Sequence, residues 1–267
     1  MKNRKRNRKY RRITTAEHTR WDVYLNNHII DGYKEAIDKT MSWLESPAAV
    51  EFFTRQNQQL TTFFTTSGIR DTWDTIIETR ANTGKDITKQ IYDYARSVNM
   101  TDHLVPYTRA ETLALNRLCD YNYELIRNVT NDEITAIRRT LVQDFAEGVY
   151  PLRTNLKKLQ LEPINGFSPA KRAEMIARTE TARTLNVSTL TTLQADGVKE
   201  VILYGCDPTC DECYEYCTEP QKITDALDLE LPHPNCTGVW SAFYGDELDQ
   251  TSIQEHIDAH EQAKKED

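Results

Sequence analysis

The sequence has few residues that interrupt helices. Of its 267 residues only nine are glycine and nine are proline, which is typical of a helix-rich protein. No apolar run approaches the roughly 20 residues that a helix needs to cross a bilayer. No apolar stretch follows the positive charges at the N-terminus either. We therefore expect neither a membrane span nor a secretory signal.

Cysteine is also scarce, and it is unevenly distributed. Five of the six cysteines lie between positions 206 and 236, within GCDPTCDECYEYC and LPHPNCTG. Without a secretory signal we expect a reducing cytoplasm, where clustered cysteines bind metals more often than they form disulfides. The isolated Cys119, His18, His28 and His103 are assigned no chemistry.

Positive charge is concentrated at one end of the chain. The first 12 residues hold eight of the 33 basic side chains and no acid, and the remainder carries 25 basic and 41 acidic side chains. Such an arm is expected to be disordered. It could neutralise nucleic-acid phosphates, contact an acidic protein surface, or be a solvated tail. The candidate contact residues are Lys2, Arg4, Lys5, Arg6, Arg8, Lys9, Arg11 and Arg12.

The pattern from residue 14 to about 160 is helical. Apolar residues recur at three- and four-residue spacing from Trp21 to Leu44, which predicts one long helix that stops at Pro47. Breaks are predicted at Asn82-Thr83-Gly84 and at Pro106. The further predicted helices cover 48–67, 70–80, 86–99, 108–129, 132–147 and 152–161.

The C-terminal part combines a helix with a strand. Ser168 and Pro169 are typical of a helix start and Gly197 of a helix end, which predicts a helix from Pro169 to Asp196. The following VKEVILYG predicts a buried strand. The fold class is therefore α+β and predominantly helical. The expected parts are a basic arm (1–12), a helical region (13–129), a small α+β domain with the cysteine loops (130–244) and an acidic tail (245–267).

Two residue pairs have the spacing of a metal site. Cys210 and Cys213 are separated by two residues, and so are His233 and Cys236. Two such pairs from separate loops can supply four ligands to a tetrahedral zinc. Because the protein would fill every coordination position, we expect a structural zinc that stabilises loops with little core of their own.

The cysteine cluster also allows other interpretations. Cys206 and Cys217 flank the first pair and could form a disulfide, replace one of the four ligands, or remain buried thiols. All five cysteines could equally be plain thiols or pair as disulfides. No enzyme is predicted, because four protein ligands leave no position for water and no nucleophile is paired with a base.

The order of the C-terminal features resembles a known family. Its pieces are a helix pair with a glycine turn, Arg178-Thr179-Glu180, a strand, Cys210-x-x-Cys213 and His233-Pro234-Asn235-Cys236. Over about residues 130–240 they resemble the C-terminal domain of the phage Mu F-like minor head proteins, also called phage head morphogenesis proteins. The sequence departs from that pattern in two places. Thr237 and Gly238 replace a further cysteine after Cys236, and the loop after Cys213 carries Cys217 in place of the usual Asp-Gly.

The resemblance implies a role in the virion. Members are minor proteins of the capsid interior near the portal, act in head assembly and in some cases leave with the genome at ejection. The implied partners are the portal protein, capsid or scaffold proteins, and packaged DNA through the N-terminal arm. No membrane and no small-molecule substrate is implied. The implied location is the virion, with the host cytoplasm during assembly.

Arg178, Glu180 and Arg183 are interpreted as a structural polar network that ties the long helix to the cysteine loops. The alternative function is a zinc-ribbon nucleic-acid-binding module of a mobile element. Such a module needs a basic surface near the metal, but residues 205–236 contain one lysine and eight acids. This composition disfavours contact with phosphates.

Overall fold

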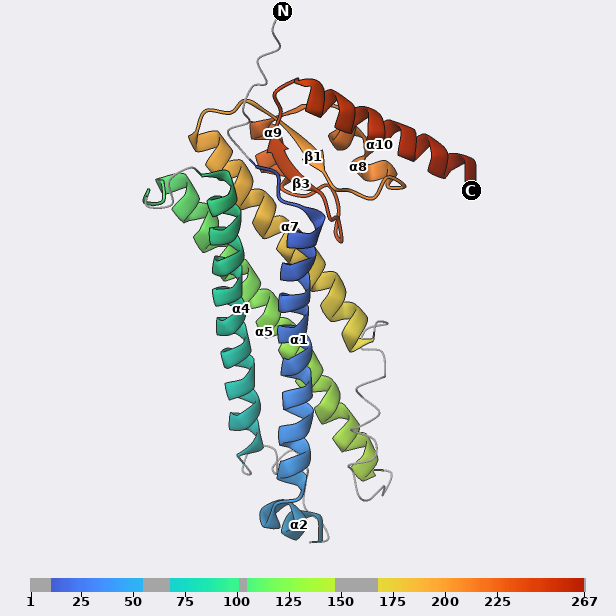
Figure 1. The fold of residues 1–267 in the computed structure, drawn as a ribbon. Helices are drawn as coiled ribbons and strands as arrows, with labels where there is room; N and C mark the ends of the chain where they lie inside the picture. Colours follow the sequence, from blue (N-terminus) through green and yellow to red (C-terminus); the bar gives the residue numbers. More distant parts are fainter. Residues whose placement is uncertain (1–10, 55–67, 101–104, 147–167, 267) are drawn as a thin grey trace, which may run out of the picture. The chain divides into compact units, whose positions relative to one another are not determined.

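The computed structural model describes residues 11–54, 68–100, 105–146 and 168–266, which form two compact units. The first unit contains the described residues within 1–23, 87–119 and 175–267, and the second those within 24–86 and 120–174. Four long helices contribute to both units (Figure 1). They are α1 (Thr15–Leu44), α4 (Ile69–Asn99), α5 (Arg109–Ala146) and α7 (Pro169–Ala195).

Helices α1 and α5 begin with the same capping arrangement. The Glu17 backbone N–H donates to Thr14 Oγ1 at 3.3 Å, and the Thr14 N–H donates to the Glu17 carboxylate at 2.8 Å. Thr108 and Glu111 repeat this reciprocal pair, with distances of 3.2 and 2.7 Å. Each pair satisfies two backbone donors that a helix start leaves without intrahelical partners.

The second unit has a core made of three helices. Apolar side chains of α1, α4 and α5 pack together there, and the Trp73 indole N–H donates to Thr40 Oγ1 at 2.9 Å inside the core. The long helix predicted from the apolar spacing between Trp21 and Leu44 is therefore confirmed, and part of its apolar face lies in this core. The buried core residues are Tyr33, Ala36, Ile37, Leu44, Ile69, Trp73, Ile76, Ile77, Ile134, Ile137 and Leu141.

The predicted break at Pro106 is confirmed, because it lies between α4 and α5. The predicted break at residues 82–84 and the predicted division of 108–147 into two helices are wrong. Helix α4 continues through Asn82-Thr83-Gly84, and α5 continues across residues 129–132. A Cβ on Gly84 would collide with Ile126 Cδ1, so this glycine allows α4 and α5 to approach closely. Thr130 bonds back to the Ile126 carbonyl at 2.9 Å and stays within the helix.

Helix α2 covers Pro47–Thr54. The rest of the helix predicted to residue 67 and the predicted helix at 152–161 lie outside the described residues.

Helix α7 begins and ends as predicted. Ser168 Oγ accepts the Lys171 N–H at 3.3 Å, and Gly197 ends the helix with a φ of 83°. The Gly197 N–H bonds to the Gln194 carbonyl and the Val198 N–H to the Leu193 carbonyl, each at 3.0 Å. This pair of bonds is the Schellman motif, which satisfies the last carbonyls of a helix.

One face of α7 is buried although it is rich in hydroxyls. Within the first unit Ser188 donates to the Tyr92 carbonyl at 2.7 Å, and Thr191 and the Tyr92 hydroxyl lie 2.9 Å apart. The Asn99 amide donates to Thr189 at 3.3 Å. The three α7 side chains are almost fully buried, so these bonds offset the loss of their contacts with water.

The first unit also contains a small antiparallel sheet with the order β2-β1-β3. The predicted strand is β1 (Glu200–Tyr204), and it pairs with β2 (Gln221–Lys222) and β3 (Val239–Ala242). The short helices α8 (Asp211–Thr218) and α9 (Ile223–Leu229) follow β1 and β2. Helix α10 (Glu247–Glu266) forms the acidic C-terminal segment and packs against α8 (Figure 1).

The predicted fold class is confirmed. The described N-terminal part is helical, and the C-terminal part is a small α+β region with a three-stranded sheet and a cysteine and histidine cluster. Among the described residues, no helix is both long enough and apolar enough to cross a bilayer.

Candidate metal centre

The two predicted ligand pairs form the same local turn. The Cys213 N–H reaches the Cys210 carbonyl at 3.3 Å, and the Cys236 N–H reaches the His233 carbonyl at 3.4 Å. Each turn places two potential ligands on one side of a tight loop. The first pair lies at the start of α8, and the second lies between α9 and β3.

The turns bring sulfur and imidazole atoms together. His233 Nε2 lies 3.2 Å from Cys210 Sγ and 3.1 Å from Cys213 Sγ, and Cys213 Sγ lies 3.5 Å from Cys236 Sγ. In a tetrahedral zinc site, bond lengths of about 2.3 Å to sulfur and 2.0–2.1 Å to nitrogen place the ligand atoms roughly 3.6–3.8 Å apart. The observed separations would have to widen by about 0.3–0.5 Å to hold zinc.

The cluster contains two overlapping groups of possible ligands. One is Cys210, Cys213 and His233, and the other is Cys206, Cys213 and Cys236; within each group the ligand atoms lie within 4.8 Å of one another. Cys213 belongs to both groups, and its side chain is 1% exposed. These groups could hold a metal ion such as zinc, because thiolate and imidazole are the ligands that zinc prefers.

Backbone groups and neighbouring thiols favour the metal-binding forms of two ligands. His233 Nδ1 lies 2.7 Å from the Pro234 carbonyl; a proton on Nδ1 donates to that oxygen and leaves the Nε2 lone pair facing the sulfurs. The Gly238 N–H donates to Cys236 Sγ at 3.3 Å. Hydrogen bonds from Cys206 and Cys213, with that N–H, lower the pKa of Cys236 and so favour its thiolate.

Helix α7 holds the loop between His233 and Cys236. Arg178 donates to Asn235 Oδ1 at 3.3 Å, and the Asn235 N–H donates to Thr179 Oγ1 at 2.9 Å. Asn235 has a φ of 69°, in the left-handed region that asparagine tolerates better than most residues. Thr179, which is not among the three predicted members of the polar network, therefore also holds this loop.

The other two residues of the predicted network, Glu180 and Arg183, pair with each other, and Arg183 also pairs with Glu230. Arg183 lies 3.1 Å from Glu230 and 3.3 Å from Glu180, and Arg117 also pairs with Glu230. Burial raises the pKa of Glu180 to about 7, although Arg183 opposes this increase. Arg183 thus ties α7 to the end of α9, just before the second ligand pair.

Sequence reasoning missed two further supporting residues. The fully buried Asn186 donates to the Gly238 carbonyl at 3.1 Å and accepts the Trp240 N–H at 2.9 Å, which fixes the start of β3. His260 of α10 lies 2.5 Å from the Pro208 carbonyl and 3.2 Å from Asp211. A polar residue in the middle of a buried helix was a usable signal for Asn186, but no sequence signal distinguished His260.

The described residues of the basic arm make internal ion pairs. Arg11 pairs with Glu17 at 2.7 Å, and Arg12 pairs with the fully buried carboxylate of Asp249 at 2.9 Å. The Arg12 guanidinium also lies over the Tyr204 ring, 3.5 Å from its centre. The other six candidate contacts, Lys2, Arg4, Lys5, Arg6, Arg8 and Lys9, lie outside the described residues.

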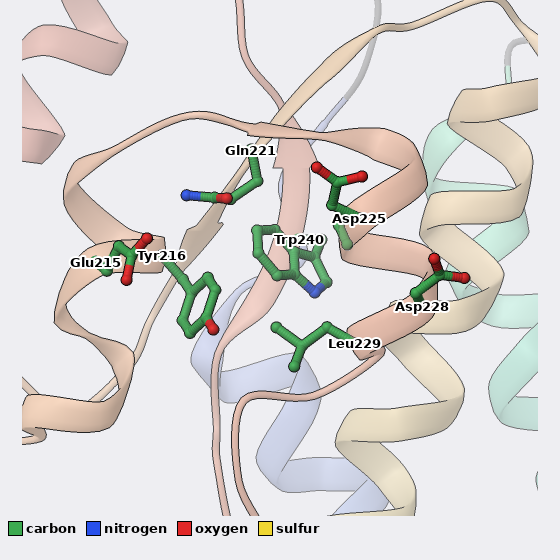
Figure 2. A pocket seen from close by; sticks show the side chains of 8 residues that line it. Glu215, Tyr216, Gln221, Asp225, Asp228, Leu229 and Trp240 are labelled. Carbon is green, nitrogen blue, oxygen red and sulfur yellow. The ribbon is translucent and has the colours of Figure 1, made fainter.

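A cavity of about 450 Å³ lies beside the cysteine loops (Figure 2). Its apolar part is formed by Trp240 of β3 and Tyr216 of α8, with their ring centres 6.0 Å apart, together with Ala226 and Leu229 of α9. Glu215, Asp225 and Asp228 supply carboxylates to its wall. These negative charges disfavour binding of phosphate groups.

Comparisons of the chain with family models, with curated proteins and with solved structures find no match.

Proposed function

We propose that this chain is a non-enzymatic phage minor head protein whose C-terminal region is stabilised by a structural zinc. The observation that supports this proposal best is the convergence of the motif pieces on one loop. Arg178 and Thr179 both bond to Asn235, which lies between His233 and Cys236, while His233 contacts both cysteines of the first pair. The α7 motif, the first cysteine pair and the second ligand pair, which are far apart in the sequence, thus contact one another.

The proposed zinc ligands are Cys210, Cys213, His233 and Cys236. Three of the six separations between their ligand atoms are 3.1, 3.2 and 3.5 Å, near the roughly 3.6–3.8 Å of a tetrahedral site. Cys236 shares a group of possible ligands with Cys213 and not with Cys210 and His233, so it would have to move closer to them to complete the site. Four protein ligands leave no coordination position for a water molecule or a substrate. The metal would therefore contribute folding free energy to the loops and would not take part in catalysis.

The proposed partners are the portal protein, capsid or scaffold proteins, and packaged DNA. Contact with DNA is assigned to the arm within residues 1–10, because Arg11 and Arg12 already bind Glu17 and Asp249. The cavity beside the cysteine loops carries carboxylates, which disfavours a nucleic-acid-binding module centred on the metal. The proposed location is the capsid interior near the portal, with the host cytoplasm during assembly.

Virion association can be tested with particles from the strain that encodes the chain. Mass spectrometry of density-purified particles should detect its peptides at a few copies per portal. Disruption of the gene should lower the yield of infectious particles, and complementation should restore it. Purified particles that lack these peptides would refute the proposal.

The role of the arm can be tested on the purified chain. Replacing Lys2, Arg4, Lys5, Arg6, Arg8 and Lys9 with glutamine should abolish the salt-dependent part of DNA binding. A control with six exposed lysines and arginines of α1, α4 and α5 replaced by glutamine should retain it. Equal losses in both variants would argue against a specific role for the arm.

A further inference from the structure

Cys206 and Cys217 form a thiol pair that the proposed zinc site does not use. Their sulfurs lie 2.6 Å apart, and both side chains are buried, with exposed fractions of 8% and 4%. Nonbonded heavy atoms normally stay roughly 3.5–4.0 Å apart, whereas a disulfide bond is about 2.05 Å long. The pair is thus closer to the bonded separation than to a relaxed contact.

The separation fits a metal less well. Two thiolates on one tetrahedral zinc lie roughly 3.8 Å apart, so this pair would have to open by more than 1 Å. Cys213 and Cys236, by contrast, already lie 3.5 Å apart. Cys206 Sγ also lies within 4.8 Å of the sulfurs of Cys213 and Cys236, so the thiol pair adjoins the proposed zinc ligands, whereas Cys217 belongs to neither group of possible ligands.

The surrounding structure keeps the two sulfurs together. Cys217 lies on the buried face of α8, four residues after Cys213. Cys206 follows Gly205, whose φ of 79° turns the chain away from β1. A Cβ on Gly238 would lie 2.7 Å from Cys206 Sγ, so only glycine at this position leaves room for the sulfur.

A cavity gives a small molecule access to Cys217. Cys217 lines a cavity of about 270 Å³ together with residues of the turn after β1 and of α10. The cavity is large enough for a peroxide molecule, because a water molecule occupies about 30 Å³ in the liquid. Its other lining residues are Leu203, Tyr204, Gly205, Pro208, Ser252, Glu255, His256 and Ala259.

We propose that Cys206 and Cys217 form a redox-dependent disulfide that braces the loop carrying Cys210 and Cys213. With hydrogen peroxide as the oxidant, the Cys217 sulfur attacks one peroxide oxygen and becomes a sulfenic acid, with loss of one water molecule. The Cys206 sulfur then displaces the sulfenic oxygen as a second water molecule, and the S–S bond forms. The two thiols lose two electrons and two protons in total, and the peroxide gains them.

The bond would make the metal loop harder to open. It would close residues 206–217 into a loop that contains both ligands of the first pair, which restricts the conformations available after metal loss. In a reducing cytoplasm the pair would stay as two thiols, and in an oxidising environment it would be bonded. The effect on metal loss rests on the proposed structural zinc, but neither it nor the disulfide depends on the virion role.

The linkage can be tested on the full-length, zinc-loaded chain. After treatment with a small excess of peroxide, intact mass should fall by about 2 Da. Peptide mapping should join Cys206 to Cys217, while Cys210, Cys213 and Cys236 remain available for alkylation once the metal is removed. A bond that includes one of those three cysteines, or the absence of any bond, would overturn the proposal.

The bracing can be measured as the rate of zinc loss to a chelator. Oxidised wild type should lose zinc more slowly than reduced wild type, by on the order of tenfold. The Cys217→Ala variant, which removes the cysteine that belongs to neither group of possible ligands, should still bind one zinc per chain and lose it at the same rate in both conditions. If this variant folds but binds no zinc, the pair supplies ligands and the proposal is wrong.

Discussion

Asn235 combines a backbone and a side-chain role in the ligand loop. Its φ of 69° lies in the left-handed region, and its amide oxygen accepts a hydrogen bond from Arg178. Asn235→Ala should destabilise the chain by about 2 kcal/mol, because alanine adds backbone strain and the hydrogen bond is lost. Asn235→Gly should cost about half as much, because glycine adopts this φ freely. Urea unfolding would contradict this explanation if both variants were equally stable.

Glu133 should make stability fall as pH rises. Burial raises the pKa of this α5 side chain from 4.5 to about 8, against the opposing charge of Arg172. The folded chain therefore keeps a proton that the unfolded chain releases between these two values, so the free energy of unfolding decreases across this pH range. The decrease should be on the order of 3 kcal/mol between pH 4.5 and 7.

The variant Glu133→Gln should remove this pH-dependent loss and be more stable than wild type at pH 8. Urea unfolding at several pH values measures the free energy of unfolding of each variant. The exposed control Glu124→Gln, on the same helix, should keep the wild-type pH dependence. A wild-type slope that persists in Glu133→Gln would show that another group causes it.

At the scale of single elements, the contact between α4 and α5 depends on one glycine. Gly84→Ala should destabilise the chain by about 1–3 kcal/mol, because the added Cβ overlaps Ile126. Gly32 of α1 is a matched control, since its added Cβ would meet only the flexible Arg80 side chain at 3.3 Å. Gly32→Ala should be neutral or stabilising by up to about 1 kcal/mol. Thermal unfolding shifts of the same sign in both variants would contradict the packing explanation.

Local signals predicted some elements and missed others for physical reasons. Helix α7 and strand β1 were predicted because a cap, a terminal glycine and a change of period are all encoded within the segment itself. The continuity of α4 at Gly84 was not, because it depends on Ile126 in another helix. Spacing likewise identified the four candidate ligands. It could not show that Cys206, in the turn after β1, approaches Cys217 on α8.

At the scale of the whole molecule, removal of the metal should affect the two units differently. Zinc binding is expected to contribute on the order of 10 kcal/mol to folding of such loops, while the core of the second unit contains no proposed ligand. A zinc chelator should therefore increase hydrogen exchange at least about a hundredfold in residues 205–240 and leave the core of the second unit protected.

The variant Cys213→Ser should reproduce this exchange pattern without chelator, and Cys119→Ser, which replaces a cysteine outside the cluster, should not. Elemental analysis of the untreated chain should give one zinc per chain. A metal-free protein with identical exchange in both conditions would remove the basis for a structural zinc.

The hydroxyl-rich face of α7 limits how this protein can be recombined with others. The side chains of Ser188 and Thr189 depend on Tyr92 and Asn99, which precede the cysteine loops by about a hundred residues. A chimera that grafts residues 130–267 onto foreign helices would carry every proposed zinc ligand but would lose these partners. Each orphaned hydroxyl would then cost about 1–3 kcal/mol, so a transplant that keeps its stability must begin before residue 87.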